Sequence, residues 1–329
     1  MAIVYTAVIP AYNAAATLDA CLAALNAAEP PPDQVVVVDD GSTDETGAIA
    51  ERHGAEVIRN DGKPMGPARG RNAAAARARN DLILFVDADV VVDADAPRRL
   101  LAEMETDDKI AATFGSYGTH QAASNVTARY ANLRHHFYHQ EGHSEAETFW
   151  AGLGAVRRSV FEELGGFDHA IDRPRLEDVE LGFRIREHGY RIRLVRDALG
   201  THLKNWTLRR LWREEIQTRA VPWSEMMAAG RCKASLNASS REKALAVLAH
   251  LIWLSAALTP VNPGFAMASA AGAVVYIAAN WRLLALFRRH GGWPTAVAGV
   301  GLHWAYHLYS SVTFVLVFAR VLARTRLGG

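Results

Sequence analysis

Four consecutive valines, Val35 to Val38, constrain the fold of this chain more than any other sequence feature. A β-branched run without polar alternation is typical of a strand buried on both faces, and such strands belong to parallel sheets. Further strands are predicted over Ile3–Ile9, Glu56–Ile58 and Leu82–Val86. Helical stretches are predicted between them, from near Thr17, through Ile49, and from about Ala68 to Ala78. This alternation predicts an open, mostly parallel α/β sheet flanked by helices.

Acidic side chains follow two of the predicted strands directly. Asp39 and Asp40 end the valine run, and Asp87 and Asp89 follow Leu82–Val86. Aspartate at such a position is often only a turn former or helix cap, but two such sites on one sheet favour a ligand beyond the carboxyl ends of the strands. Carboxylate oxygens are ligands that Mg²⁺ and Mn²⁺ accept while bridging phosphates. We therefore expect a nucleoside diphosphate and a divalent cation at this edge.

Two common nucleotide motifs are absent from the sequence. It lacks Gly-x-x-x-x-Gly-Lys-Ser/Thr, and no Gly-x-Gly-x-x-Gly follows the first strand, which argues against a kinase and a dehydrogenase. A nucleotidyltransferase would need a glycine-rich, basic loop after that strand, whereas Pro10 to Ala16 contains neither glycine nor lysine or arginine.

Six short segments in a fixed order resemble those of the family 2 glycosyltransferases with the GT-A fold, over roughly residues 3 to 205. The segments are Val8–Asn13, Val36–Asp44, Gly66–Asn72, Phe85–Asp89, Gly165–Asp168, and Glu177–Glu180 followed by Gly189–Ile192. The resemblance implies an inverting glycosyltransferase that uses a nucleotide-diphosphate sugar and Mn²⁺ or Mg²⁺.

The resemblance also implies roles for individual residues. The implied nucleotide contacts are Pro10, Tyr12, Asp40, Arg71 and Asp87. The implied cation ligands are Asp89, Asp87 and His202, although a surface histidine at a domain border is the alternative for His202. Family members often carry an acid after Tyr-Asn, whereas Ala14 and Ala15 stand here, so part of the nucleotide contact departs from the pattern.

The implied catalytic residues are Asp178, as general base, and its neighbour Glu177. Both lie at the start of a predicted helix through His188, where negative charge is favoured by the helix dipole. The same position suits a simple helix cap. An acceptor hydroxyl needs such a base, whereas a phosphate acceptor is already anionic.

The charge of the chain divides at about residue 204. Residues 1–203 hold 21 lysines and arginines against 31 acids, whereas residues 204–329 hold 15 against 4. Residues 244–281 and 291–319 contain no Asp, Glu, Lys or Arg. A membrane-crossing helix needs about 20 apolar residues. We expect transmembrane helices at about 244–259, 264–281 and 295–319, with buried helices of a soluble domain as the alternative.

The basic residues predict the orientation of these helices. Arg282, Arg288, Arg289 and His290 favour the cytoplasm for the segment that connects the second and third helices. Three crossings would place the C-terminal arginines on the opposite side, so one segment is expected to be re-entrant or interfacial. We expect a multi-pass protein of the inner membrane whose catalytic domain faces the cytoplasm.

The domain organisation predicted from these patterns has three parts: a catalytic domain over 1–205, amphipathic interfacial helices over 206–243, and transmembrane helices over 244–329. Tryptophans mixed with arginines between Trp206 and Met227 suit the lipid headgroup layer, and equally a solvated helix packed on the domain. The membrane region favours a lipid-linked or polyprenyl-phosphate acceptor at the cytoplasmic leaflet and no nucleic-acid partner.

Other features exclude or leave open further classes. Cys21 and Cys232 lie far apart, so neither a zinc motif nor a disulfide framework is predicted, and a reducing compartment without a signal peptide is expected. The histidines His135, His136, His139 and His143 are expected to be solvated or packed rather than metal ligands. An inactive, membrane-bound nucleotide-binding partner protein is the non-enzymatic alternative.

Overall fold

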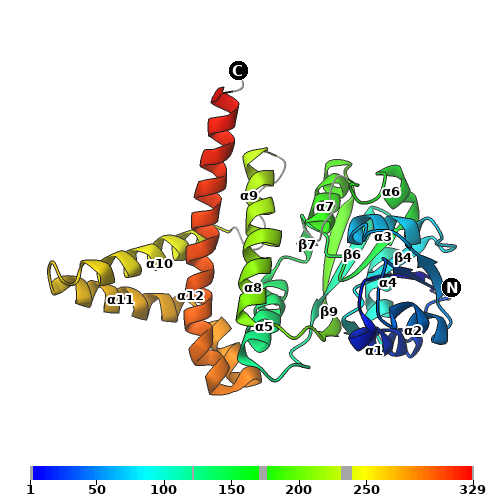
Figure 1. The fold of residues 1–329 in the computed structure, drawn as a ribbon, viewed down its shortest axis with the longest axis horizontal. Helices are drawn as coiled ribbons and strands as arrows, with labels where there is room; N and C mark the ends of the chain where they lie inside the picture. Colours follow the sequence, from blue (N-terminus) through cyan, green and yellow to red (C-terminus); the bar gives the residue numbers. More distant parts are fainter. Residues whose placement is uncertain (1–2, 121, 170–175, 231–238, 328–329) are drawn as a thin grey trace. The chain divides into compact units, whose positions relative to one another are not determined.

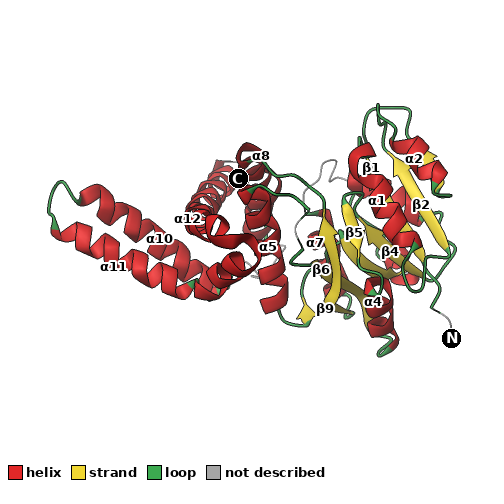
Figure 2. Ribbon diagram, turned by 90° about the horizontal axis from the view of Figure 1, so that it is seen from below, coloured by secondary structure: helices red, strands yellow, loops and turns green. Residues whose placement is uncertain are grey.

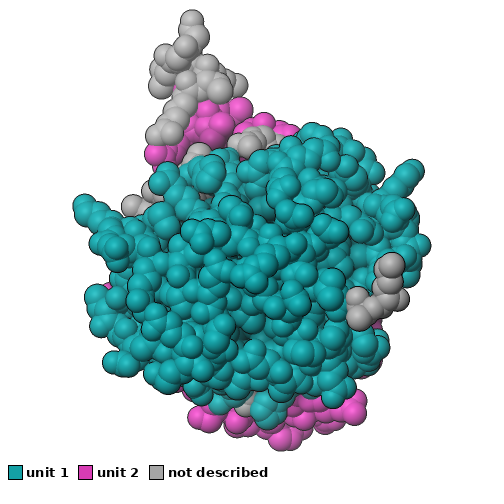
Figure 3. Space-filling view, turned by 90° about the vertical axis from the view of Figure 1, so that its right-hand side faces the viewer, with its two compact units in different colours: residues 1–123, 139–204 teal, residues 124–138, 205–329 magenta. Residues whose placement is uncertain are grey.

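The computed structural model of the chain describes residues 3–120, 122–169, 176–230 and 239–327. It divides into two compact units, coloured separately in Figure 3. The catalytic unit consists of residues 1–123 and 139–204, and the helical unit consists of residues 124–138 and 205–329. We expected an unbroken first domain over 1–205. The structure instead assigns 124–138 to the helical unit, because most of one helix packs with the C-terminal helices.

The catalytic unit contains a mixed β-sheet, which Figure 2 shows in yellow. Its strand order is β3-β2-β1-β4-β8-β6-β9-β5, with β7 paired to β9. Strands β1, β2, β3 and β4 are mutually parallel, whereas β8 runs antiparallel between β4 and β6. The described strands are β1 Thr6–Ala11, β2 Gln34–Asp39, β3 Glu56–Arg59, β4 Leu82–Val86, β5 Val90–Val92, β6 Ile110–Tyr117, β7 Glu145–Ala146, β8 Leu153–Arg157 and β9 Arg191–His202.

Helices cover both faces of this sheet, which explains why its central strands are apolar throughout. In β2, Val37 packs into the core that includes α1, whereas Val36 and Val38 pack into the core that includes α3 and α7. All three side chains are fully buried. The helices of the unit are α1 Ala15–Asn26, α2 Thr46–Arg52, α3 Pro67–Ala75, α4 Ala96–Glu105, α6 Arg158–Glu163 and α7 Glu177–Glu187.

The helical unit begins with most of α5, Val126–Glu141, and resumes after residue 204. Its next elements are α8 Leu208–Glu214, a π-helical turn Glu215–Ala220 and α9 Val221–Ala228. The C-terminal elements are α10 Ser240–Leu258, α11 Gly264–Ala279 and α12 Trp281–Leu327. Helices α10 and α11 run side by side as a hairpin (Figure 1). Part of the expected interfacial segment 206–243, namely residues 231–238, lies outside the described residues.

Helix α12 extends further than the expected third helix, 295–319. The expected connecting segment around Arg288 is helical and joins the next helix at Gly292, where the backbone has a positive φ of 75°. Leu283 and Phe287 lie one turn apart and are buried in the unit. This apolar face stabilises a helix that the basic residues alone did not indicate.

The C-terminal helices expose many large apolar side chains. One helix among the described residues, Trp281–Ala323, is long and apolar enough to cross a membrane by length and composition. Only 6% of its most apolar window is buried inside the unit. Large exposed apolar side chains also occur on α10 and α11, including Trp253 and Val274. An apolar surface of this extent marks an interaction with a membrane or another protein.

Candidate functional site

The acidic residues meet at one edge of the sheet because the strands that carry them are parallel. Ala11 at the end of β1 pairs with Asp39 at the end of β2, and β1 also pairs in parallel with β4, which Asp87 follows. The carboxyl ends of these strands therefore lie on the same side, as the buried valine-rich pattern predicts.

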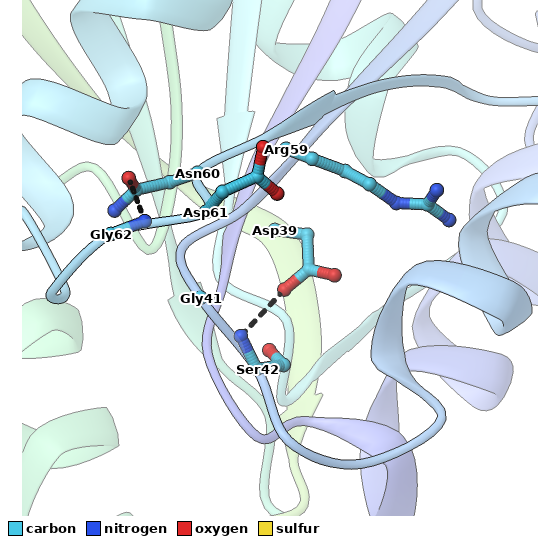
Figure 4. A pocket seen from close by; sticks show the side chains of 7 residues that line it. All are labelled: Asp39, Gly41, Ser42, Arg59, Asn60, Asp61 and Gly62. Carbon is cyan, nitrogen blue, oxygen red and sulfur yellow. Dashed lines mark hydrogen bonds between the residues drawn. The ribbon is translucent and has the colours of Figure 1, made fainter.

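A polar pocket of about 280 Å³ lies beyond the ends of β2 and β3. Figure 4 shows Asp39 at its wall, accepting a hydrogen bond of 3.0 Å from the backbone N–H of Ser42. The residues lining the pocket are Asp39, Gly41, Ser42, Arg59, Asn60, Asp61 and Gly62. Its size and polar donors and acceptors suit part of a nucleoside.

Asp40, the predicted nucleotide contact, faces its own loop. Its carboxylate accepts hydrogen bonds of 2.8 Å from the Asn60 amide and from the backbone N–H groups of Met65 and Gly66. Only 6% of Asp40 is exposed. It therefore anchors the loop before α3, and the acid that lines the pocket is its neighbour Asp39. Successive side chains of a strand point to opposite faces, so Asp39 and Asp40 cannot both face the pocket.

The turn after β1 is held against the loop after β2. Pro10 lies half-buried within β1, whereas Tyr12 is 52% exposed. Asn13 adopts a positive φ of 48°, and its side-chain oxygen accepts a 2.9 Å hydrogen bond from the N–H of Thr43. The N–H of Ala15 donates to Asp44 at 3.1 Å, so an acid from a different loop stands beside the alanine pair.

Arg71 connects two predicted site residues. Its guanidinium donates to Asp87 at 2.7 Å and to Glu177 at 2.8 Å, and only 5% of Arg71 is exposed. Burial alone would lower its pKa, but Asp87, Glu177 and Asp178 outweigh burial and raise that pKa above its ordinary value. Arg71 is thus a permanent charge that orients the two carboxylates, and Glu177 is engaged as its partner.

Asp178 lies beside this pair in a different environment. One carboxylate oxygen accepts from the backbone N–H of Ala151 at 3.1 Å, and the other accepts from the N–H of Val179 at 2.8 Å. Burial and the negative charge of Glu177 raise the pKa of Asp178 to about 7, against the lowering effect of Arg71. A carboxyl group with this pKa changes its proton near neutral pH, as a general acid or base must.

Asp89 and His202 are brought together by β5 and β9. Val90 pairs with His202 in an antiparallel register, and the ring Nε2 of His202 lies 3.4 Å from an oxygen of Asp89. Burial alone would raise the pKa of Asp89, but the His202 ring and the charge of Lys204 hold that pKa below its ordinary value. Asp89 is therefore an ionised carboxylate next to an imidazole, a pair that can bind a cation.

Three further residues, which the sequence analysis did not assign to the site, support it. Tyr117 stacks on His202 with ring centroids 4.5 Å apart, because β6 pairs with β9. Asn72 donates to the carbonyl of Phe167 at 2.8 Å and accepts from its N–H at 2.9 Å. Asn72 and Phe167 both belong to segments of the family resemblance, which was the available signal for them. Tyr117 belongs to none.

The histidine-rich segment contributes to packing. His139 is buried, and its Nδ1 lies 3.0 Å from the carbonyl oxygen of Gly115. Its ring also contacts Phe114 and Trp150 edge-on. For His139, the expectation of a packed rather than metal-binding side chain agrees with these contacts.

The fold and the acid-lined sheet edge define a GT-A domain, and comparisons with known proteins agree. Residues 6–165 match the model of glycosyl transferase family 2. The O-antigen chain rhamnosyltransferase RfbN of Salmonella typhimurium is 30% identical over 227 residues, which cover 64% of this chain and 69% of RfbN. The corresponding WbaN of Salmonella anatum is 27% identical, covering 65% of this chain and 70% of WbaN.

A solved structure extends the similarity of fold beyond the catalytic unit. The mannosyltransferase PcManGT from Pyrobaculum calidifontis aligns with 94% of this chain and 86% of its own, with a TM-score of 0.54 and 19% identity. That structure is described as a complex with GDP-Man and Mn²⁺. This similarity concerns the fold alone. The match to the family model and to RfbN shows that the chain belongs to the family 2 glycosyltransferases.

Proposed function

We propose that the chain transfers a sugar from a nucleotide-diphosphate sugar to a lipid-linked acceptor at the cytoplasmic leaflet of a membrane, with inversion at the anomeric carbon. The observation that carries the proposal is the placement of Asp89 beside His202 at the same sheet edge as Asp87, Arg71 and Asp178. This arrangement provides a cation site, a fixed positive charge and a titratable carboxyl group together.

The donor proposal rests on the pocket and on the relatives. The pocket lined by Asp39 and Arg59 takes the nucleoside, and the diphosphate extends toward Asp87 and Asp89 along the strand ends. RfbN and WbaN are rhamnosyltransferases by name, and PcManGT was solved with GDP-Man. These names support a nucleotide-sugar donor for this chain.

The donor set of the site fits a divalent cation of the Mn²⁺ or Mg²⁺ type. Asp89 offers an ionised carboxylate and His202 an imidazole nitrogen, while Asp87 has one oxygen on Arg71 and another available. A bound cation would neutralise negative charge on the departing diphosphate. The roles of the protein are to hold the carboxylates in place through Arg71 and to orient His202 through Tyr117.

Asp178 is the proposed general base. As the acceptor oxygen bonds to the anomeric carbon and the bond to the diphosphate breaks, the acceptor proton moves to the Asp178 carboxylate. Glu177 acts as a positioning residue, because its carboxylate is paired with buried Arg71. This assignment differs from the expectation that Glu177 and Asp178 are both catalytic residues.

Membrane attachment is proposed from the C-terminal helices. The long apolar helix Trp281–Ala323 is accompanied by a shorter apolar helix, Gly264–Ala279, and both expose large apolar side chains. Arg288 and Arg289 lie in the first part of α12, before Gly292, and favour a cytoplasmic position for that part of the helix. RfbN and WbaN are named O-antigen chain rhamnosyltransferases, and these names support a lipid-linked acceptor and an inner-membrane location.

A polyprenyl phosphate is the second candidate acceptor. The raised pKa of Asp178, about 7, makes its carboxylate form incomplete at neutral pH, and an anionic phosphate acceptor needs no base. Asp178→Asn separates the candidates. Transfer to a hydroxyl acceptor falls about 10²- to 10⁴-fold, whereas transfer to a phosphate acceptor is retained.

The decisive experiment uses the full chain in lipid nanodiscs with a panel of nucleotide sugars. We expect hydrolysis of one donor and transfer to lipid extract with Mn²⁺, and neither reaction after chelation. Asp89→Ala abolishes both, whereas Asp81→Asn, on the exposed opposite end of β4, is the matched control. Absence of any nucleotide-sugar turnover with folded protein contradicts the proposal and favours an inactive binding partner.

A further inference from the structure

A second cluster of metal-ligating side chains lies inside the helical unit. Glu242 is in the first turn of α10, and His303 and His307 lie four positions apart on α12, so both histidines share one helix face. One ligand atom from each of the three residues lies within 4.8 Å of the others. The three residues are 5%, 1% and 2% exposed, respectively. Three buried side chains that can each ligate a metal ion therefore converge on one point.

His303 provides an independent sign that a ligand belongs there. Its Nε2 is buried and has no hydrogen-bond partner in the described structure, whereas its Nδ1 lies 3.4 Å from the hydroxyl of Tyr130. A buried polar atom without a partner is unfavourable, because it has lost its hydrogen bonds to water without gaining others. A metal ion that accepted the Nε2 lone pair would remove this cost.

His307 is already oriented as metal-bound histidines are. Its Nδ1 lies 2.7 Å from the hydroxyl of Tyr276 and 3.1 Å from the carbonyl oxygen of His303. Hydrogen bonding at one ring nitrogen fixes the tautomer and directs the other nitrogen at the metal. The other nitrogen, Nε2, lies 3.0 Å from an oxygen of Glu242. Two ligand atoms of a tetrahedral zinc ion are separated by a similar distance, about 3.3 Å.

Glu242 is held as an ionised ligand. Its carboxylate accepts from the hydroxyl of Tyr138 at 2.8 Å and pairs with the guanidinium of Arg241, which is 47% exposed. These contacts keep the carboxylate charged inside the helical unit. The set of two imidazoles and one carboxylate leaves a fourth position open.

We propose that Glu242, His303 and His307 bind one divalent transition-metal ion of the zinc type. Imidazole ligands favour Zn²⁺ over Mg²⁺ and Ca²⁺, which bind oxygen ligands. The ion joins the start of α10 to the middle of α12. The site is independent of the proposed glycosyl transfer, because none of its residues belongs to the catalytic unit.

The test measures zinc binding rather than activity. Full-length protein without a histidine tag is stripped with a chelator, supplied with Zn²⁺ alone, and analysed by equilibrium dialysis and elemental analysis. Asp89→Ala serves as the background, since His202 and Asp89 can also bind zinc. We expect one zinc ion per chain in this background. If Asp89→Ala loses sugar transfer but still binds zinc, the two sites are separate. A failure of the proposed catalytic site can then be told from a failure of the proposed zinc site.

Variants in the Asp89→Ala background assign the ligands. His303→Ala and His307→Ala weaken zinc binding by more than about 100-fold, and Tyr276→Phe weakens it about 10- to 100-fold through the lost outer hydrogen bond. His250→Ala is the matched control, because His250 lies in the same unit but bonds to Ser311 at 2.8 Å. Unchanged zinc affinity in folded His303→Ala and His307→Ala overturns the proposal.

Two further measurements test the proposal if the alanine variants do not fold. His303→Gln conserves volume and is expected to lose zinc to the same extent. Co²⁺ added to the Asp89→Ala protein should give the intense visible absorption of four-coordinate cobalt, and Zn²⁺ should displace it. Zinc stoichiometry near zero, or cobalt that stays six-coordinate, excludes the site without any further variant.

Discussion

The ring nitrogen Nε2 of His202 lies 3.4 Å from the carboxylate of Asp89, because the antiparallel pairing of β5 with β9 places Val90 opposite His202. The backbone extends the same contact, since the N–H of Leu203 donates to the carbonyl of Asp89 at 2.8 Å. The relative position of the two side chains is thus set by sheet register rather than by a flexible loop.

Replacement of His202 tests whether this pair holds a cation. We expect His202→Ala to raise the Mn²⁺ concentration for half-maximal donor hydrolysis by at least about 10- to 100-fold. Loss of a residue that only hydrogen-bonds to a metal ligand already weakens metal binding by this factor, and loss of a ligand should weaken it at least as much. The matched control is His188→Ala, since His188 is exposed and bonds only to the backbone of Arg184 at 2.8 Å among its described contacts. An unchanged Mn²⁺ dependence in folded His202→Ala places the cation elsewhere.

Asp39 is predicted to contribute to nucleotide affinity. A hydrogen bond to a charged group contributes about 1.5–3 kcal/mol, so Asp39→Asn should weaken nucleoside diphosphate binding roughly 10- to 100-fold. Asp33 is exposed and precedes β2 at the opposite end of the strand, so Asp33→Asn should leave binding unchanged. Calorimetry with the full chain measures both constants, and equal affinities for the two variants would remove Asp39 from the nucleotide pocket.

Local apolar patterns were sufficient to predict β4 at Leu82–Val86, the valine strand and the acids that follow them. A strand that is buried on both faces has a strong local signature, and parallel neighbours bring their carboxyl ends together. The antiparallel insertion of β8 and the contact of Arg71 with Glu177 depend on long-range pairing that no local window contains. For the same reason, the sequence did not indicate that residues 124–138 pack with the helical unit.

The pH dependence of transfer is predicted from Asp178. Burial and the charge of Glu177 raise the pKa of Asp178 to about 7, so the reactive carboxylate form increases as pH rises from 6 to 8. With a hydroxyl acceptor, kcat/KM should therefore rise through a midpoint near pH 7, whereas an ordinary carboxyl group would already be ionised below pH 6. Asp178→Asn should lower kcat about 10²- to 10⁴-fold and abolish this dependence, while nucleotide affinity stays nearly constant.

A second acid-to-amide substitution, outside the site, is the control for Asp178→Asn. Asp197→Asn changes an exposed residue of β9 and should retain both the rate and the pH profile. Because a phosphate acceptor itself titrates near pH 6, the profile is interpreted only together with the Asp178→Asn variant. Equal loss of nucleotide affinity in Asp89→Ala and Asp178→Asn would falsify the division of roles between cation ligand and base.

The ion pair of Glu215 and Arg134 is predicted to stabilise the helical unit. Its atoms lie 2.7 Å apart, and both side chains are buried. Burial alone would raise the pKa of Glu215, but Arg134 and Arg219 lower it to about 2. Since the folded-state pKa is lowered, this stabilisation is present above the ordinary glutamate pKa and is lost as pH falls toward 2.

Glu215→Gln leaves the Arg134 charge buried without its partner and should lower the free energy of unfolding by about 3–5 kcal/mol at pH 7. Glu214→Gln is the matched control, because its ion pair joins a half-buried Glu214 to an exposed Arg210 and contributes at most about 1 kcal/mol. Denaturant unfolding in detergent compares the two variants. A difference below about 1 kcal/mol would mean that the buried pair adds no net stability.

Gly182 on α7 is predicted to control how closely that helix approaches the segment before β8. A Cβ at Gly182 would lie 2.3 Å from the backbone nitrogen of Phe149 and 2.8 Å from backbone atoms of Thr148, so the backbone itself must move. Overpacking of this kind costs about 1–3 kcal/mol. The same movement displaces Asp178 from the N–H of Ala151, which it contacts at 3.1 Å, and should reduce kcat together with stability.

Gly118→Ala provides the control, since its Cβ would meet no atom nearer than 3.9 Å. We expect Gly182→Ala to lower both the unfolding temperature and the transfer rate while Gly118→Ala changes neither, and a Gly182→Ala protein of unaltered stability would show that α7 can retreat from this segment without cost.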